Sequence, residues 1–403
     1  MSRINDLIKE LCPNGVTYQT IGSVCDFQNG YAFKSNLFKD DGDILLRITN
    51  IDGKQIDLSD VKYIDTRDYN TDLSSFKVYN DDIVIAMSGA TTGKIGINHT
   101  NKILYLNQRV GKLTPKDVSL NNHFLYHYLL SKVNYFYQLA GGGAQPNLSS
   151  DAIKNTSIPI PPLEVQEEIV RILDKFGELE AELEAELEAR RSQYEFWRGK
   201  LLTKEKCFKS IKDILKNHCS GATPLKGNSA FYDNGDIPWL RTQEVRFNEV
   251  FKTECFITKY ALEKTGVKYI PANCVIVAMS GATAGRCAIN KIPLTTNQHC
   301  LNLEIDSSKA DYKYVFYCMC NAYNDLISKK EGARGDLNSS KIINHKIPIP
   351  SLEEQQRIVQ ILDKFDKLVN DISVGLPAEI EARRKQYEYY RNKLLSFEEV
   401  LCE

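Results

Sequence analysis

Residues 158–176 read IPIPPLEVQEEIVRILDKF, and residues 347–365 read IPIPSLEEQQRIVQILDKF. The two blocks lie 189 residues apart and are identical at 14 of their 19 positions. A second match follows each of them, because EARRSQYEFWRGKLL at 188–202 returns as EARRKQYEYYRNKLL at 381–395. Self-similarity at a fixed period marks a repeated structural unit. The chain therefore consists of two copies of a unit of about 190 residues.

The similarity between the two copies is uneven. Before the long matches they share only short islands, such as MSGATTGKIGIN at 87–98 with MSGATAGRCAIN at 279–290, and NQR at 107–109 with NQH at 297–299. We therefore expect two like frames that carry two unlike modules, each acting on a different target. A duplication kept for stability alone is the alternative, but it gives the modules no reason to diverge more than the frames.

Each frame has the pattern of a long helix. Apolar residues recur every three or four positions, which gives one apolar stripe per helix, and forty residues would span roughly 60 Å. The stripes comprise Ile169, Leu173, Phe176, Leu183 and Leu187 in the first copy, and Ile358, Leu362, Phe365, Val369 and Ile372 in the second. If they bury each other, the helices form an antiparallel coiled coil with a pseudo-two-fold axis and a module at each end. Gly375 and Pro377 should break or kink the second helix.

The predicted fold is mixed α/β, with two globular modules alternating with two long helices. The expected boundaries are 1–157 for module 1, 158–203 for the first helix, 204–346 for module 2 and 347–403 for the second helix. Within the modules, the apolar runs 83–86 and 275–278 read as strands. The Tyr/Leu-rich stretches 123–139 and 312–327 read as amphipathic helices.

Charge is segregated along the chain of 403 residues, although its net charge is only -1. Residues 204–346 contain 21 basic and 14 acidic side chains, whereas 163–203 contain 6 basic and 11 acidic ones. Module 2 therefore has the charge balance of a nucleic-acid-binding surface. The glutamate-rich stretch 178–188 is expected to be a solvated face or a surface for partner subunits.

No apolar run is long enough to cross a bilayer, and the N-terminus lacks the pattern of a secretory signal. The eleven scattered cysteines do not form a disulfide framework, which favours a cytoplasmic protein. His123 and His127 are spaced as metal ligands could be, but no carboxylate or cysteine lies near them in the sequence. We expect no metal site.

The turn after each apolar run resembles a phosphate-binding loop but fails as one. Gly89 to Lys94 is one residue short of the Walker pattern, Ile95 stands where Ser or Thr should follow, and the second copy has Arg286 in place of the lysine. The pattern therefore disfavours nucleotide hydrolysis. A tight turn can still direct side chains at a DNA phosphate, and the candidates are Thr91, Thr92, Lys94, Thr283 and Arg286. The alternative is that the glycines only turn the chain.

Other side chains in the modules are of types that read base edges in the major groove. The candidates are Gln108 and Arg109 with Gln298 and His299 in the shared NQ islands, Arg47, Arg241 and Gln243 after the matched DGDI and NGDI segments, and Gln145 and Arg334 in the glycine loops before each frame.

The order of these parts resembles the specificity subunit of a type I restriction-modification system over nearly the whole chain. The most specific elements are the two IPIP blocks and the SGATTGK and SGATAGR turns. The resemblance implies that each module is a target recognition domain for one half of a spacer-separated sequence in double-stranded DNA. It also implies that the helices hold the modules apart and dock two methylation subunits, which bind S-adenosylmethionine, and that restriction subunits complete the nuclease. The chain itself would bind no cofactor.

Two other functions remain open at this stage. A DNA-modifying enzyme in its own right is disfavoured, since the Pro-Pro at 161–162 lies between Ile160 and Leu163 rather than in an Asn/Asp-Pro-Pro-Tyr/Phe motif. A coiled-coil scaffold that recognises protein would differ from the DNA reader by lacking salt-dependent binding to duplex DNA.

Overall fold

The structure is a computed structural model that describes residues 2–141, 146–204, 207–329, 336–371 and 373–400. Contacts divide the chain into two units. Unit 1 comprises Met1–Glu184 together with Ile380–Glu403, and unit 2 comprises Ala185–Glu379. This division cuts through the long helices, whereas the module boundaries expected from the sequence lie outside them, so those boundaries stay a prediction.

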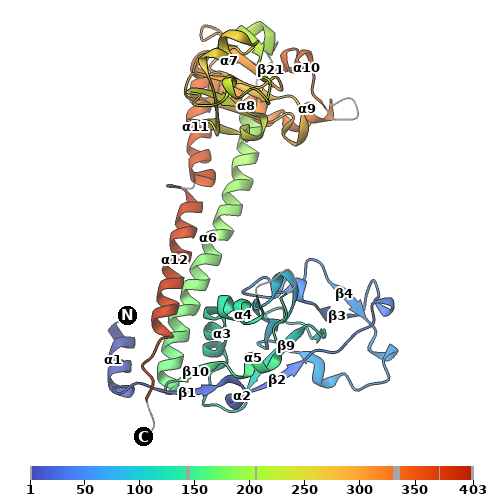
Figure 1. The fold of residues 1–403 in the computed structure, drawn as a ribbon, viewed down its shortest axis with the longest axis vertical. Coiled ribbons are helices and arrows are strands. Elements are labelled where there is room, and N and C mark those ends of the chain that lie inside the picture. Colours follow the sequence, from blue (N-terminus) through green and yellow to red (C-terminus); the bar gives the residue numbers. More distant parts are fainter. Residues whose placement is uncertain (1, 142–145, 205–206, 330–335, 372, 401–403) are drawn as a thin grey trace. The chain divides into compact units, whose positions relative to one another are not determined.

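Unit 1 contains two four-stranded sheets and a two-stranded one (Figure 1). The first sheet has the order β2 (Cys25–Asn29), β9 (Val110–Pro115), β6 (Ile83–Ala86) and β7 (Ile95–Ile97). The second has the order β4 (Lys62–Ile64), β3 (Asp43–Leu46), β8 (Leu104–Leu106) and β5 (Lys77–Val78), with β3 and β8 parallel. The third pairs β1 (Thr17–Thr20) with β10 (Ser157–Ile160).

Unit 2 repeats this strand order. One sheet runs β12 (Leu215–Ser220), β20 (Cys300–Ile305), β17 (Val275–Ala278), β18 (Cys287–Asn290) and β14 (Asn248–Val250). The next runs β15 (Cys255–Ile257), β13 (Ile237–Leu240), β19 (Leu294–Thr296) and β16 (Tyr269–Ile270), again with a central parallel pair. The two-stranded pair is β11 (Phe208–Ser210) with β21 (Lys346–Pro348). The two modules are therefore copies of one fold despite their divergent sequences.

Helices cover these sheets and join the modules to the frames. The α-helices are α1 (Ser2–Leu11), α2 (Ile21–Val24), α3 (Asn122–Ser131), α4 (Val133–Leu139), α5 (Ser150–Lys154), α6 (Leu163–Thr203), α7 (Lys259–Lys264), α8 (Tyr312–Asn321), α9 (Tyr323–Ser328), α10 (Ser339–Ile343), α11 (Leu352–Asn370) and α12 (Leu376–Leu394). The 3-10 turns are η1 (Ser35–Leu37), η2 (Ile48–Asn50), η3 (Thr66–Asp68), η4 (Ser74–Phe76), η5 (Gly89–Thr91), η6 (Ile211–Ile214), η7 (Ser229–Phe231), η8 (Thr242–Glu244) and η9 (Gly281–Thr283).

Several sequence predictions are confirmed at the level of elements. The runs 83–86 and 275–278 are strands β6 and β17, buried at all four positions, as a continuous apolar run requires. The Tyr/Leu-rich stretches are helical, but each is two helices rather than one. The helical backbone is interrupted at Lys132 and at Ala322, where ψ is close to zero.

The first long helix is unbroken over the 41 residues of α6, whereas the second is interrupted. Helix α11 begins at the Ser351 cap, whose Oγ accepts a hydrogen bond from the backbone N–H of Glu354, and it ends at Asn370. The N–H of Gly375 donates to the carbonyl of Asp371, and α12 begins at Leu376. The predicted break near Gly375 and Pro377 is therefore confirmed. Pro377 itself lies in the first turn of α12, where its missing N–H costs nothing.

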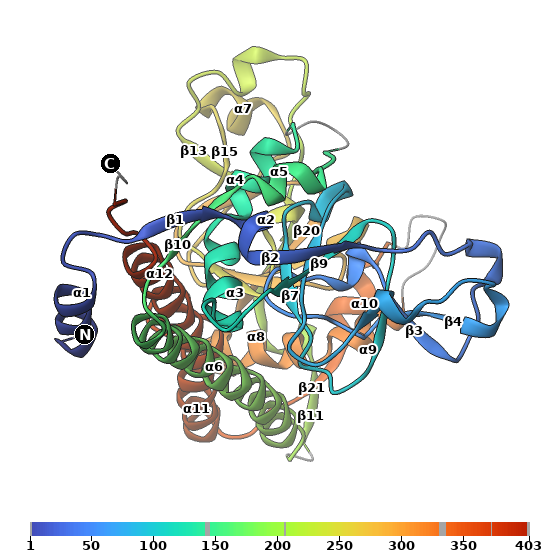
Figure 2. The same cartoon turned by 90° about the horizontal axis from the view of Figure 1, so that it is seen from below.

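The apolar stripes of the frames pack largely into the modules. In unit 1, Ile169 and Leu173 of α6 are fully buried in one cluster with Phe124 and Leu125 of α3. In unit 2, Ile358, Leu362 and Val369 of α11 are buried in a cluster with residues of α8. Figure 2 shows α3 beside α6, and contacts place α3 against β7 as well. Each frame therefore supplies part of a module's core.

Helix-to-helix contacts exist beside these cores. In unit 1, Phe176 stacks on Tyr390, and Glu180 pairs with Arg384, so α6 and α12 run antiparallel there. In unit 2, Tyr194 of α6 stacks on Phe365 of α11. Leu183 and Leu187 are half-buried, and Ile372 lies outside the described residues. Among the helices of the described residues, none combines the length and the apolar character that crossing a membrane requires.

Candidate nucleic-acid interface

Three turns meet along one edge of module 1, each directly after a strand. The backbone N–H of Met87, after β6, donates to the carbonyl of Arg109 in the turn between β8 and β9. The N–H of Asn107, after β8, donates to the carbonyl of Leu46 at the end of β3. We call this the turn edge of module 1. It collects the candidates Arg47, Thr91, Lys94, Gln108 and Arg109.

Module 2 has the same turn edge. The N–H of Met279 donates to the carbonyl of His299, and the N–H of Asn297 donates to that of Leu240. Gln298 and His299 are exposed in the turn between β19 and β20, as Gln108 and Arg109 are in module 1. The remaining candidates here are Arg241, Gln243, Thr283 and Arg286. The fold thus brings together residues as far apart in the sequence as Arg47 and Arg109, which are separated by 62 positions.

The glycine turns have a structural role that the sequence left open. Gly89 and Gly93 have positive φ of 77° and 82°, and Gly281 and Gly285 repeat this with 70° and 88°. A side chain is strained in that region of backbone space. The chain therefore needs these glycines to turn, and the turn holds Thr91 and Lys94 half-exposed at the edge.

Thr92 corrects one sequence prediction. Its side chain is only 3% exposed, and its Oγ1 donates a hydrogen bond to the carbonyl of Gly89 at 2.7 Å. The equivalent residue in module 2 is the buried Ala284, which has no hydroxyl. Thr92 therefore stabilises the turn from inside, and a direct contact with phosphate is wrong for this residue.

The two arginines that follow β3 and β13 have carboxylate partners. Arg47 lies 3.6 Å from Asp60, and Arg241 lies 2.7 Å from Glu254, which also accepts a hydrogen bond from Gln243. In both modules the acid lies 13 positions after the arginine. These guanidinium groups are partly satisfied within the chain, so base contact would require them to exchange a carboxylate for a base edge. The candidates Gln145 and Arg334 lie outside the described residues.

The sequence did not predict two buried polar contacts that recur in equivalent places of the two copies. Gln166 is fully buried at the start of α6, accepts a hydrogen bond from the backbone N–H of Asn121 at 2.8 Å and donates to the carbonyl of Pro161. Gln355 does the same in α11, with the N–H of Asp311 at 2.9 Å and the carbonyl of Pro350. A signal was available, because this glutamine is identical in the two IPIP blocks. It fixes the N-terminal end of α3 or α8 to the frame.

A second anchor joins the same helices one or two turns further on. In unit 1, Nε2 of His127 lies 2.8 Å from Asp174, and its Nδ1 lies 3.2 Å from the hydroxyl of Tyr387. In unit 2, the hydroxyl of Tyr317 donates to Asp363 at 2.6 Å. Asp174 and Asp363 are equivalent aspartates of the two blocks.

This anchor corrects the expectation that the α3 histidines lack an acidic neighbour. The carboxylate comes from the frame, 47 residues further along the chain, so local spacing could not reveal it. Burial lowers the pKa of His127, although its hydrogen bond to Asp174 opposes that shift. Burial raises the pKa of Asp174, but the hydrogen bond to His127 together with the nearby charges of His127, His123 and His99 holds that pKa below its usual value.

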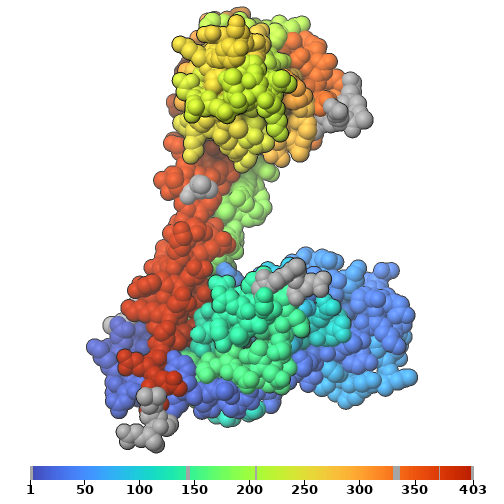
Figure 3. Space-filling model, viewed as in Figure 1, coloured from blue at the N-terminus to red at the C-terminus, as the bar shows by residue number. Residues whose placement is uncertain are grey.

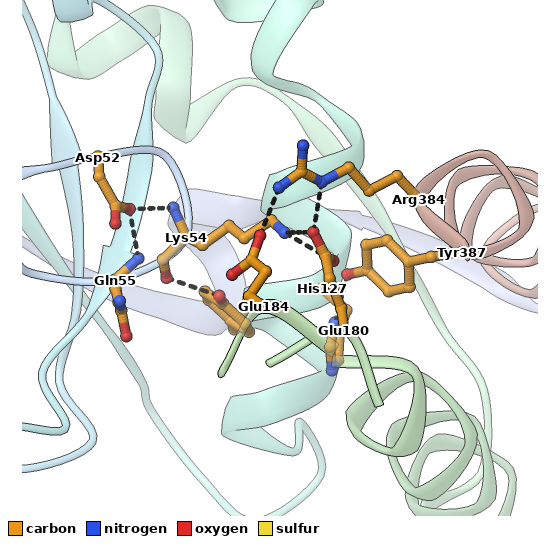
Figure 4. A network of polar contacts seen from close by, with 9 residues as sticks. Asp52, Lys54, Gln55, His127, Glu180, Glu184, Arg384 and Tyr387 are labelled. Atoms are coloured by element: carbon orange, nitrogen blue, oxygen red, sulfur yellow. Dashed lines mark hydrogen bonds and ion pairs between the residues drawn. The ribbon is translucent and has the colours of Figure 1, made fainter. Parts of the chain in front are cut away.

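A polar network links the frame to the loop of module 1 that contains Asp52 and Lys54 (Figure 4). Glu180 is buried, contrary to the solvated face predicted for the glutamate-rich stretch, and it binds Lys54 at 2.8 Å and Arg384 at 2.6 Å. Burial opposes its ionisation, yet the hydrogen bonds from Arg384 and Lys54 hold the pKa of Glu180 below its usual value. Asp52 caps the loop that carries Lys54 by accepting two backbone N–H bonds.

Five of the predicted helix residues are buried within their own unit and do not form a docking surface, namely Ile169, Leu173, Ile358, Leu362 and Val369. The exposed apolar residues of the frames are different ones. Phe196 is 62% and Tyr389 is 61% exposed, and they occupy the same position of the EARR repeat. Leu163 and Leu352, also equivalent, are each 38% exposed. The space-filling view shows α12 forming part of the surface along its visible length (Figure 3).

Comparison with known families and proteins agrees with this architecture. A family model described as type I restriction modification DNA specificity domain matches residues 13–189 and again 204–382. The chain is 37% identical over 288 residues to the type I restriction enzyme EcoR124I/EcoR124II specificity subunit of Escherichia coli, which covers 68% of this chain and 70% of that protein. It is 36% identical over 320 residues to a putative type I restriction enzyme specificity subunit of Haemophilus influenzae, covering 73% and 76%.

Solved structures share the fold. The S subunit of a type I restriction-modification system from M. genitalium matches with a TM-score of 0.57 at 16% identity, covering 95% of this chain and 97% of that one. A chain from a study of complex assembly and conformational transition of the type I R-M system matches with a TM-score of 0.63, also at 16% identity, covering 95% and 98%.

Proposed function

Because this chain belongs to the type I restriction-modification DNA specificity family, we propose that its two modules read the two halves of a split target in double-stranded DNA. The chain is a non-catalytic specificity subunit, and it works in a complex with methylation and restriction subunits. We further propose that two methylation subunits bind each specificity subunit and supply S-adenosylmethionine. Recognition then belongs to this chain, and chemistry to its partners.

The observation that carries the proposal is the turn edge, which is built the same way in both modules. Each edge gathers side chains from three strand ends, with exposed hydrogen-bonding groups at its centre. Gln and Arg side chains are suited to adenine and guanine edges in the major groove. The differing pairs, Gln108 with Arg109 and Gln298 with His299, support different half-targets for the two modules.

Other residues of the edge would position the DNA without reading it. Lys94 and Arg286 occupy equivalent places beside the glycine turns, and a cation there suits a phosphate. Thr283 offers a hydroxyl group at the turn of module 2, whereas Oγ1 of Thr91 is buried and would need a change of rotamer to reach a phosphate. Arg47, Arg241 and Gln243 would join the base contacts once DNA displaces their carboxylate partners.

The frames would dock the methylation subunits through positions that recur in the two copies. Phe196 and Tyr389 are large, exposed and equivalent, and aromatic residues dominate binding energy at protein interfaces. Two equivalent surfaces support two copies of one partner.

Substitutions at the turn edge test the proposal in the complex with methylation subunits. Lys94→Ala should weaken DNA binding equally for all sequences and reduce the slope of log affinity against log salt concentration by about one. Arg109→Ala should in addition relax the base preference at one half of the target. Lys116→Ala is the matched control, because this exposed lysine lies just after the opposite end of β9. Binding without salt dependence would favour the alternative function, a scaffold that recognises protein. Edge variants that bind DNA as Lys116→Ala does would exclude the turn edge as the DNA-binding surface.

A further inference from the structure

A cluster of metal-ligating side chains lies on module 1, away from the turn edge. Asp81 comes from the turn before β6, His99 from the turn after β7 and His123 from α3. One ligand atom from each lies within 4.8 Å of the other two. Nε2 of His99 is already 3.2 Å from Oδ1 of Asp81, and the two imidazole rings stack with centroids 6.1 Å apart.

The spacing of these groups suits a tetrahedral metal. Zinc bonds of 2.0–2.2 Å to nitrogen and oxygen place neighbouring ligand atoms about 3.4 Å apart. The Asp81–His99 distance meets that requirement, and His123 would need to approach by up to about 1.4 Å. Asp81 and His99 are each about half-exposed, and His123 is one-third exposed, so their side chains can rotate to close the site.

Asp174 of α6 adds the group that commonly stands behind a metal-bound histidine. Its Oδ2 lies 3.8 Å from Nδ1 of His123, which leaves Nε2 of the same ring for a metal. A carboxylate on the second ring nitrogen orients the imidazole and raises its basicity. The cluster thus has three potential ligands and one supporting carboxylate from the frame.

We propose that Asp81, His99 and His123 bind a divalent transition-metal ion of the zinc class, with water as the fourth ligand. The ion would cross-link two turns of the module to α3, the helix that Gln166 and Asp174 anchor to the frame. The inference is independent of which DNA sequence the module reads.

Module 2 shows what the same positions look like without metal ligands. The residues equivalent to Asp81, His99 and His123 are Asn273, Lys291 and Lys313. Nζ of Lys291 donates to Oδ1 of Asn273 at 2.9 Å, and Nζ of Lys313 pairs with Asp363 at 2.9 Å. Nζ of Lys291 also donates to the hydroxyl of Tyr312 in α8 at 3.1 Å, so this one ammonium group makes, as direct contacts, the turn-to-turn and turn-to-helix links that the ion would make in module 1. Since ammonium groups cannot ligate a metal, module 2 is an internal reference.

The test is metal binding to the full chain after chelator treatment, with Cys207 and Cys402 replaced by Ser so that thiolates there do not compete. Zinc is titrated by calorimetry, and cobalt by its visible absorption, which distinguishes four from six ligands. We expect one equivalent of metal, four-coordinate cobalt and a higher melting temperature with zinc. His99→Lys and His123→Lys, which install the module 2 residues, should each abolish that equivalent, and Asp174→Asn should weaken it roughly tenfold.

Control variants separate loss of the metal site from loss of folding. His218→Ala removes an exposed histidine of module 2 and should leave the binding unchanged. Asp81→Asn, another module 2 residue in a turn with the same backbone, gives a second variant if a lysine disturbs folding. Circular dichroism without metal establishes that each variant is folded. Absence of a stoichiometric site in the parent, or equal affinity in the parent and the folded His99→Lys and Asp81→Asn variants, would overturn the proposal.

Discussion

The buried glutamine at the start of each long helix makes a strong prediction about stability. Gln166 is fully buried and satisfies the N–H of Asn121 and the carbonyls of Ser119 and Pro161 at once. Leaving buried polar groups unsatisfied costs about 1–3 kcal/mol each. We therefore expect Gln166→Ala to lower the free energy of unfolding by at least that amount, measured by urea denaturation of the full chain.

Two comparisons make that prediction specific. Gln193→Ala changes an exposed glutamine of the same helix and should have almost no effect. Gln355→Ala should destabilise the chain less than Gln166→Ala, since the side chain of Gln355 makes two hydrogen bonds to the backbone and that of Gln166 makes three. Equal and small effects of all three would mean that the glutamines do not anchor the modules.

The buried histidine of unit 1 predicts a loss of stability in mild acid. His127 has its pKa lowered, first by burial, so in the folded state it stays neutral where the unfolded chain takes up a proton. The stability it contributes is complete above the unfolded pKa of about 6.5 and is lost as the pH falls below it. The melting temperature should therefore drop between about pH 6.5 and 5.

The variant His127→Tyr isolates this contribution. Tyrosine is the residue at the equivalent position in module 2, where Tyr317 reaches its aspartate without a titrating ring. The variant should lose less stability over the same pH range than the parent. His345, whose pKa burial also lowers, is present in both proteins and cancels in the comparison. Identical pH profiles would assign the acid sensitivity to other groups.

At the scale of elements, the sequence was most reliable where one physical signal acts alone. The continuous apolar runs of β6 and β17 and the helical stripe of α6 were predicted because burial alone determines their pattern. The break near Gly375 followed from backbone chemistry, and the structure adds its cause. A Cβ on Gly375 would lie 2.4 Å from the carbonyl oxygen of Lys367, so the chain closes against the end of α11. The interruption at Lys132 had no such signal.

The unbroken helix α6 predicts the length of the spacer between the two half-targets. Deleting the four residues 183–186 removes about 6 Å of helix while keeping Glu180 and its partners. If α6 sets the distance between the readers, the preferred spacer should shorten by one or two base pairs, at about 3.4 Å each. Methylation of a library of targets with varied spacers, by the complex with methylation subunits, measures it.

A charge-neutral variant separates helix length from helix charge. Replacing Glu182 and Glu186 by Gln keeps every turn of α6 and removes two exposed carboxylates. This variant should retain the parent's spacer. A spacer that follows the charge change, or one that stays the same after the deletion, would mean that α6 is not the ruler.

At the scale of the whole molecule, the repeat predicted the architecture better than it predicted the contacts. The identical blocks revealed two frames, and the islands revealed the turns. Which side chains share a surface depends on strand order, and β3, β8 and β6 come together only in the folded sheets. Arg47 and Arg109 could therefore be named but not placed together, and the inward orientation of Thr92 was not predictable from a turn motif. The carboxylate partners of Arg47 and Arg241 were not predictable from the sequence either.

The duplicated fold makes a last prediction about modularity. Module 1 is joined to its frame mainly through two groups that also occur in the second copy, the buried glutamine Gln166 and the aspartate Asp174. A foreign module 1 that keeps matching partners on its α3 helix should therefore dock on the same frame. Replacing residues 1–157 by such a module should change one half of the methylated target and leave the other half and the spacer as they were.

Retaining Lys54 in the exchanged module sharpens that experiment. Its bond to Glu180 connects the loop at Asp52 to both α6 and α12, so a module without this lysine leaves a buried carboxylate with one cation fewer. Losing a partner of a buried charge is strongly destabilising. Chimeras with Lys54 should thus be more stable than matched chimeras with Lys54→Ala, while both report the same new half-target. A change in both halves of the target, read by mapping methylated sites, would contradict independent readers on a fixed frame.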